Sequence, residues 1–161
     1  MGNMQNESEI IERSNRGPVT FEWLKNDLTA IGLEPGATVM VHTSMSALGW
    51  ICGGAQTLIS VLMEIVRPYG NIVMPAHSGN LSDPSGWENP PVPESWWETI
   101  RETMPAFDPV MTPTAGIGRV AELFRTLPDV VRSNHPQVSF AVWGENCIEI
   151  ARNHELAYGL G

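Results

Sequence analysis

One turn of the chain combines hydroxyl side chains with glycines directly after an apolar run. It contains His42, Thr43, Ser44, Met45, Ser46, Gly49 and Trp50, and it ends at the pair Gly53-Gly54. Hydroxyls and free backbone N–H groups at the start of a helix are well suited to hold phosphate or pyrophosphate. The turn matches neither G-x-x-x-x-G-K-S/T nor G-x-G-x-x-G, which argues against Walker and Rossmann sites. It predicts a site for a nucleotide-bearing ligand or, as the alternative, a loop that these residues only tighten.

Residues 76–115 form an acidic, tryptophan-bearing excursion. The excursion holds seven of the thirteen prolines, and its Asp and Glu residues outnumber Arg101 by six to one. Carboxylates pair with ammonium groups, and aromatic rings attract cations, so this composition favours an amine ligand. The candidate substrate-binding residues are His77, Asp83, Trp87 and Glu88. A spacing of four residues is instead typical of the solvent-facing side of a helix, and this applies to Glu94, Glu98 and Glu102.

Four histidines lie at or near the ends of predicted strands or close to the end of the chain. They are His42, His77, His135 and His154. Imidazole titrates in the range that is useful for taking a proton from an amine, although each of these side chains could also be purely structural. No H-E-x-x-H pattern or paired spacing is present, so the sequence predicts no metal site.

Strands and helices alternate in the segments that must position these residues. Apolar runs predict strands at 37–42, 71–75 and 139–143, the first of them a central strand buried on both faces. Helical spacing predicts helices at 20–32, 53–70, 94–103, 116–126 and 145–152. A strand, a helix and a strand in succession are typical of a unit with parallel strands. We therefore predict an α/β fold with a mostly parallel central sheet, helices on both faces and a long structured loop excursion.

The size and charge of the chain limit its domain organisation and its partners. The 161 residues, of which 42% are hydrophobic, suffice for one domain with a core. A flexible lead-in over 1–16 and one α/β domain over 17–161 are expected. The net charge of −9 would repel nucleic acid and anionic membranes. Because no signal peptide or membrane-spanning segment is recognisable, we expect a cytoplasmic location.

The two cysteines, Cys52 and Cys147, form no metal-binding or disulfide pattern. Free cysteines are often buried, and both are expected to be buried thiols. An acyltransferase that uses one of them as its nucleophile is an alternative.

Five ordered blocks of this sequence closely resemble the aminoglycoside 3-N-acetyltransferases. They are VHTSMSALGWICGG (41–54), the stretch from Met74 through LSDPSGW (81–87), PPVPESWWETIRETMPAFDP (90–109), TPTAGIGRVAELFRT (112–126) and RSNHPQVSFAVWG (132–144). The resemblance implies transfer of an acetyl group from acetyl-CoA to the 3-amino group of a deoxystreptamine antibiotic, and hence antibiotic resistance. It also implies a further C-terminal portion with a catalytic histidine and carboxylate, which this sequence does not contain.

The resemblance also assigns expected roles to residues of this chain. The 42–50 turn would hold acetyl-CoA, with a second wall formed by Thr112, Thr114 and Gly116. His135 would act as a general base or as an orienting partner, and the amine would attack directly without an acyl-enzyme. The alternatives are an inactive fragment that still binds CoA or an amine, and an acetyltransferase for a different amine. The oligomeric state is not predicted.

Overall fold

A computed structural model describes residues 2–159, so Met1, Leu160 and Gly161 of the expected lead-in and domain lie outside the described residues. The N-terminal half contains α1 (Gly2–Arg13), α2 (Phe21–Ala30), β1 (Thr38–Met40), α3 (Met45–Leu48), α4 (Gly54–Val66) and β2 (Asn71–Pro75). The excursion follows, with the 3-10 turns η1 (Pro84–Gly86) and η2 (Glu94–Trp96) and helix α5 (Trp97–Thr103). The last elements are α6 (Gly118–Arg125), β3 (Val131–Arg132), β4 (Phe140–Gly144) and α7 (Cys147–Ala151).

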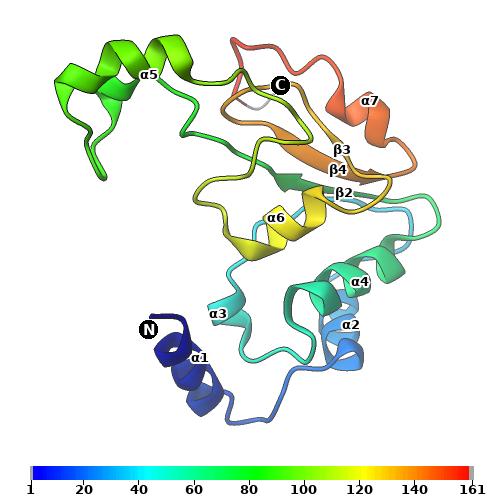
Figure 1. Ribbon diagram of the computed structural model, residues 1–161. Helices are drawn as coiled ribbons and strands as arrows, with labels where there is room; N and C mark the ends of the chain where they lie inside the picture. Colours follow the sequence, from blue (N-terminus) through cyan, green and yellow to red (C-terminus); the bar gives the residue numbers. More distant parts are fainter. Residues whose placement is uncertain (1, 160–161) are drawn as a thin grey trace.

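The described residues contain a four-stranded sheet in the order β1-β2-β4-β3 (Figure 1). Strands β1 and β2 are parallel and are joined through α4, as the sequence predicts. However, β4 pairs antiparallel with β2, and β3 pairs antiparallel with β4. The α/β class is therefore confirmed, but the prediction of a mostly parallel sheet is wrong. The cause is that β4 runs along the second edge of β2 in the opposite direction, and β3 is too short to show a periodic pattern.

Strand β1 lies at an edge of the sheet, so its prediction as a central strand buried on both faces is wrong. Within residues 2–159 it pairs with β2 alone, and Met40 is 52% exposed. Its neighbour Val39 is partly buried against the core. The central position belongs to β2, whose residues are all buried. An apolar run thus identified a strand here but not its place in the sheet.

Helices cover both faces of the sheet, in agreement with the sequence. Ile72, Met74 and Ala141 face a core formed with α2, α4 and α6. Val73, Phe140 and Val142 face a smaller cluster that includes Ala151 of α7. Side chains of a strand alternate between its two faces, which explains why β2 contributes to both clusters. In Figure 1, α2 and α4 lie on the opposite side of the sheet from α7.

The segment expected to be a flexible lead-in contains regular structure. Gly2–Arg13 form helix α1, and Ser14 follows it directly. The Ser14 hydroxyl donates to the Ile10 carbonyl oxygen over 2.8 Å and accepts a hydrogen bond from the backbone N–H of Trp50 over 3.0 Å. The division of the chain into a lead-in over 1–16 and a domain over 17–161 stays a prediction.

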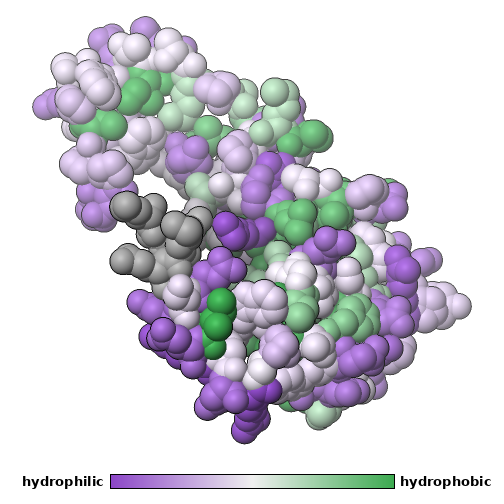
Figure 2. Space-filling view, turned by 60° about the horizontal axis from the view of Figure 1, so that its bottom comes forward, coloured by the Kyte–Doolittle hydropathy of each residue, from purple (hydrophilic) through white to green (hydrophobic). Residues whose placement is uncertain are grey.

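The excursion projects from the body as a separate lobe that carries α5 (Figures 1 and 2). Its return limb is fixed by the guanidinium of Arg132, which is 9% exposed. This group donates to the carbonyl oxygens of Ala76, Pro109 and Thr112 and to the Ser139 hydroxyl, and it lies over the Phe107 ring. Burial lowers the pKa of Arg132 to about 10, so the group stays cationic at neutral pH. One buried side chain thus joins the excursion to the ends of β2 and β4.

Candidate functional site

A cleft of about 690 Å³ opens beside the ends of β1 and β2. Its walls come from the 41–50 turn, from Met74 and Pro75 of β2, and from residues 116–121 at the start of α6. Glu7 and Ile10 of α1 complete the lining. In a sheet with parallel strands, ligands bind outside the carboxyl ends of those strands, which is where this cleft lies.

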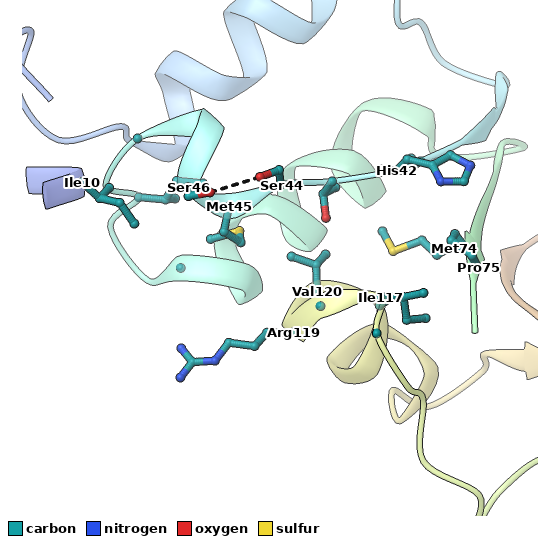
Figure 3. A pocket seen from close by; sticks show the side chains of 18 of the residues that line it. Ile10, His42, Ser44, Met45, Ser46, Met74, Pro75, Ile117, Arg119 and Val120 are labelled. Atoms are coloured by element: carbon teal, nitrogen blue, oxygen red, sulfur yellow. Dashed lines mark hydrogen bonds between the residues drawn. The ribbon is translucent and has the colours of Figure 1, made fainter. Parts of the chain in front are cut away.

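The cleft is suited to an anionic ligand. Gly54 and Gly118, the first residues of α4 and α6, both line it. Helix N-termini carry free N–H groups and a partial positive charge. Arg119 also lines the cleft, is exposed, and has no ion pair among residues 2–159. Figure 3 shows its side chain extending from α6 to the lower left, away from His42 and Pro75.

Eight of the ten predicted cofactor-binding residues line this cleft. They are His42, Thr43, Ser44, Met45, Ser46, Gly49, Trp50 and Gly116. The hydroxyls of Ser44 and Ser46 lie 3.1 Å apart and hydrogen-bond to each other (Figure 3). Their turn is short because α3 begins directly after Ser44, and Gly49 ends α3 with a φ of 87°, a conformation that favours glycine. The structure thus brings these eight residues to one site.

Thr112 and Thr114 lie outside the lining, because their polar groups are used within the protein. The backbone N–H and the hydroxyl of Thr114 both donate to the Glu122 carboxylate. The Thr112 hydroxyl accepts from the N–H of Asp108. Hydrogen bonds from Arg125 and Thr114 lower the pKa of Glu122 to about 2. These threonines hold the limb that leads to Gly116 and do not face the cleft.

The predicted amine-binding residues do not line the main cleft. Asp83 accepts two hydrogen bonds of 2.9 Å from Arg101, and these hold the pKa of its carboxyl far below its usual range. Trp87 donates from Nε1 to the Ser82 hydroxyl over 2.9 Å. By contrast, Glu88 is exposed and has no ion pair in the described part of the chain. Asp83 and Arg101 line a second cleft of about 420 Å³ beside α5.

The four histidines gather near the ends of β2 and β3. The pKa of His77 is lowered, first by burial and then by the charges of His42, His135 and His154. The His77 ring meets the Phe140 ring edge-on, with centroids 5.8 Å apart, and its Nε2 is buried without a hydrogen-bond partner. The sequence placed each histidine near a strand end, but their convergence could be found only from the fold.

His135 is held in one tautomer. Its Nδ1 accepts hydrogen bonds from the N–H groups of Gln137 and Val138, so the proton of the neutral ring lies on Nε2. The ring packs on His154, with centroids 4.6 Å apart, and does not line the cleft. With Nδ1 occupied by two backbone N–H groups, the ring offers Nε2–H as a hydrogen-bond donor. Between the two predicted roles, this geometry favours an orienting partner over a general base.

The cysteines differ from their prediction as buried thiols. Cys52 is exposed and Cys147 is partly buried. Neither lines either cleft. No three His, Cys, Asp or Glu side chains of residues 2–159 come together as a metal site requires. In the same range, no helix is long and apolar enough to cross a membrane.

Sequence reasoning missed Arg119 and Ile10 as lining residues. Arg119 is one of only nine Lys and Arg residues and lies near the start of the helix predicted at 116–126. A cation at this position could have been predicted as a contact for an anionic ligand. Ile10 lies in the segment taken as a lead-in, and no local pattern placed it beside the 42–50 turn.

The comparisons with known proteins agree with this geometry. A family model described as aminoglycoside 3-N-acetyltransferase matches residues 40–161. The SPbeta prophage-derived aminoglycoside N(3')-acetyltransferase-like protein YokD of Bacillus subtilis strain 168 is 49% identical over 95% of this chain and 56% of its own length. The crystal structure of YokD matches with a TM-score of 0.92 and 48% identity, over 96% of this chain and 57% of that chain.

Two further solved structures are described with ligands. AAC-IIIb in a binary complex with CoASH is 31% identical, with a TM-score of 0.71 over 87% of this chain and 51% of that chain. AAC-VIa bound to sisomicin is 33% identical, with a TM-score of 0.72 over 86% and 51%. This chain spans about half the length of the curated relatives it matches. The match over residues 40–161, together with 49% identity to a relative, confirms the resemblance seen in the sequence: the chain belongs to the aminoglycoside 3-N-acetyltransferase family.

Proposed function

We propose that this chain supplies the acetyl-CoA site of an aminoglycoside 3-N-acetyltransferase, which transfers acetyl to the 3-amino group of a deoxystreptamine antibiotic and confers resistance. The observation that carries the proposal is the cleft at the ends of β1 and β2, which Arg119 and the first residues of α4 and α6 line. A cytoplasmic location, where acetyl-CoA would be available, stays a prediction.

The lining of the cleft fits the chemistry of coenzyme A. Its phosphates require cations or N–H donors, and Arg119 with the start of α6 offers both. Its pantetheine arm requires mixed polar and apolar contacts, which the Ser44 hydroxyl and Met45 offer. The volume of about 690 Å³ lies in the usual range for small-molecule sites. We infer that the thioester lies toward His42 and Pro75 and the nucleotide toward Arg119.

The proposed reaction is direct acyl transfer. The amine nitrogen attacks the thioester carbonyl carbon, and a tetrahedral oxyanion forms. This intermediate breaks its C–S bond, so CoA leaves as the thiol after taking up a proton, and the amide keeps the new C–N bond. The amine must be unprotonated before attack, and the proton that it loses on bond formation must pass to a base. His135, which is buried and does not line the cleft, is proposed to act only as an orienting partner that donates a hydrogen bond from Nε2.

The antibiotic is proposed to bind against the acidic excursion. Sisomicin bound to AAC-VIa supports this substrate class. Glu88 is the better contact than Asp83, because the Asp83 carboxylate is already paired with Arg101. The Trp87 ring is half-buried and is held by its hydrogen bond to Ser82, and it would offer a flat face next to the Glu88 carboxylate. His77, half-buried beside Phe140, would support this wall rather than contact the sugar.

A second candidate function is a module that binds CoA or an amine without turnover. It is favoured by one observation: His135, the predicted catalytic residue, does not line the cleft. In this case the cleft would bind CoA, but no acetyl group would be transferred. An acetyltransferase for a different amine would share the cleft and differ only in the excursion.

One experiment separates these candidates. The chain is titrated with CoA by calorimetry and then assayed with acetyl-CoA and a deoxystreptamine aminoglycoside for release of thiol. Because Cys52 is exposed and would react with a thiol reagent, the assay uses Cys52→Ser beside the unchanged chain. Binding with thiol release supports the enzyme, and binding without release supports the module. If CoA does not bind, the proposal is wrong, and if Cys52→Ser abolishes turnover, the reaction uses a cysteine nucleophile.

A further inference from the structure

Helix α1 forms part of the main cleft although it lies outside the segment that matches the family model. That match begins at residue 40, whereas α1 ends at Arg13. Glu7 and Ile10 of α1 nevertheless line the cleft together with the 42–50 turn. In Figure 3, Ile10 lies on the same side of the cleft as Ser46, with its side chain turned toward the cleft.

Specific contacts hold α1 against the turn. The Ser14 hydroxyl accepts from the N–H of Trp50 and donates to the Ile10 carbonyl oxygen, so it joins the end of α1 to a cleft residue. Val19 forms a parallel bridge with Ile51, in which the N–H of Val19 donates to the Trp50 carbonyl oxygen over 2.8 Å. The segment between α1 and α2 is thus hydrogen-bonded to the 42–50 turn, where the sequence predicts the ligand site.

The side of the cleft on which α1 lies is also the side to which Arg119 points. In Figure 3, Ile10 lies on the left and Arg119 extends toward that side, whereas His42, Met74 and Pro75 lie on the right. A cation such as Arg119 can pair with phosphates, whereas an apolar side chain that lines the same cleft can contact only the ring or the stem of a ligand.

We propose that α1 is a wall of the nucleotide end of the acyl-donor site, with Ile10 as a binding residue and Ser14 as the positioning residue that holds α1 in place. This inference rests on the proposed function, because it takes coenzyme A as the occupant. Ile10 packs against the 3′-phosphoadenosine portion of CoA. Glu7, an exposed carboxylate on the same helix, also lines the cleft, and because its charge repels phosphate, the phosphates lie nearer to Arg119 than to α1.

Ile10→Ser tests the proposal, and the neighbouring Ile11→Ser is its matched control. Both changes remove the same apolar group from the same helix. Only Ile10 lines the cleft, because Ile11 is 54% exposed and lies outside the lining. Calorimetry measures Kd for CoA and for pantetheine, which lacks the nucleotide. We expect Ile10→Ser to weaken CoA binding about fivefold by loss of apolar contact. Pantetheine binding should stay unchanged, and Ile11→Ser should leave both values unchanged.

Ser14→Ala gives a second measurement that does not alter the lining. The change leaves the Trp50 N–H without its acceptor, so we expect CoA to bind more weakly. The melting temperature of the protein should stay unchanged, because the core is not altered. Equal Kd values for CoA in Ile10→Ser, Ile11→Ser and the unchanged chain would overturn the role of α1. Absence of CoA binding in the unchanged chain would instead remove the proposed function, so the two failures are distinguishable.

Discussion

The main cleft and the excursion contain similar kinds of residues but use them differently. In the cleft, Arg119 is exposed and has no ion pair in the described part of the chain. In the excursion, Arg101 is bound by Asp83, and the guanidinium of Arg132, which reaches the excursion from β3, is buried among carbonyl oxygens. The arginine at the cleft is therefore free for a ligand, whereas both arginines that contact the excursion are already engaged. The residue type alone does not distinguish these cases.

The largest effect should follow from Arg132→Ala, which removes the cation that fixes the excursion. The change leaves several buried carbonyl oxygens without a donor, and we expect a loss of about 3 kcal/mol in the free energy of unfolding. Urea unfolding measures this loss. Arg132→Lys is the control, because it retains the positive charge but can form fewer hydrogen bonds. A loss below about 1 kcal/mol would mean that the excursion is held by other contacts.

Arg119→Ala should affect binding and leave the fold unchanged. An exposed cation without an ion pair contributes little to stability. We expect CoA to bind about tenfold more weakly, which corresponds to about 1.4 kcal/mol, with an effect that shrinks as salt rises. Calorimetry at two salt concentrations checks this, and Arg16→Ala, on an exposed residue away from the cleft, is the control. If both variants lost CoA affinity equally, Arg119 would have no specific role in the cleft, and the contrast with the excursion would not hold.

Glu88→Gln and Asp83→Asn should separate the free from the paired carboxylate. The sequence predicts both Asp83 and Glu88 as substrate-binding residues. With Asp83 paired to Arg101, we now expect Glu88→Gln to weaken aminoglycoside binding roughly threefold and Asp83→Asn to weaken it less. Calorimetric titration with the aminoglycoside measures both. A larger effect of Asp83→Asn would show that the ligand displaces Arg101.

The smallest effect concerns acid stability. The folded pKa of Glu122 is about 2, below its usual value, so its contribution is fully present above about pH 4.5. It should be lost as the pH falls from there through 2. Because the side chain is 37% exposed, solvent screening keeps the effect small. Urea unfolding of the unchanged chain and of Glu122→Gln should converge toward pH 2, and curves that stay parallel would contradict the assignment.

The sequence predicted most of the elements correctly and their arrangement less well. Residues 71–75 form β2 as predicted, and Thr20 caps α2 by accepting from the N–H of Trp23. These features depend on neighbouring residues, which a sequence shows directly. The edge position of β1 and the antiparallel pairing of β4 depend on contacts between distant segments. Local periodicity carries no information on such contacts, and the mixed sheet could not be deduced from it.

The same distinction applies to the site. The 42–50 turn could be predicted because hydroxyls, glycines and a strand end adjoin in the sequence. Ile10 could not, because the hydrogen bond between Ser14 and Trp50 joins segments 36 residues apart. Asp83 was selected by its charge, but its partner Arg101 lies 18 residues away on α5. In each case the missing information was the partner of a polar group.

The position of β1 at the border of the sheet has a consequence for the isolated chain in solution. Along the outer side of this strand, the described residues provide no partner for its amide and carbonyl groups, and Met40 is exposed beside them. Such a border can add a strand from another molecule and so promote aggregation. The three residues of β1 limit how many hydrogen bonds such a contact could form. Concentrated samples should therefore associate weakly, and dilution should reverse this association.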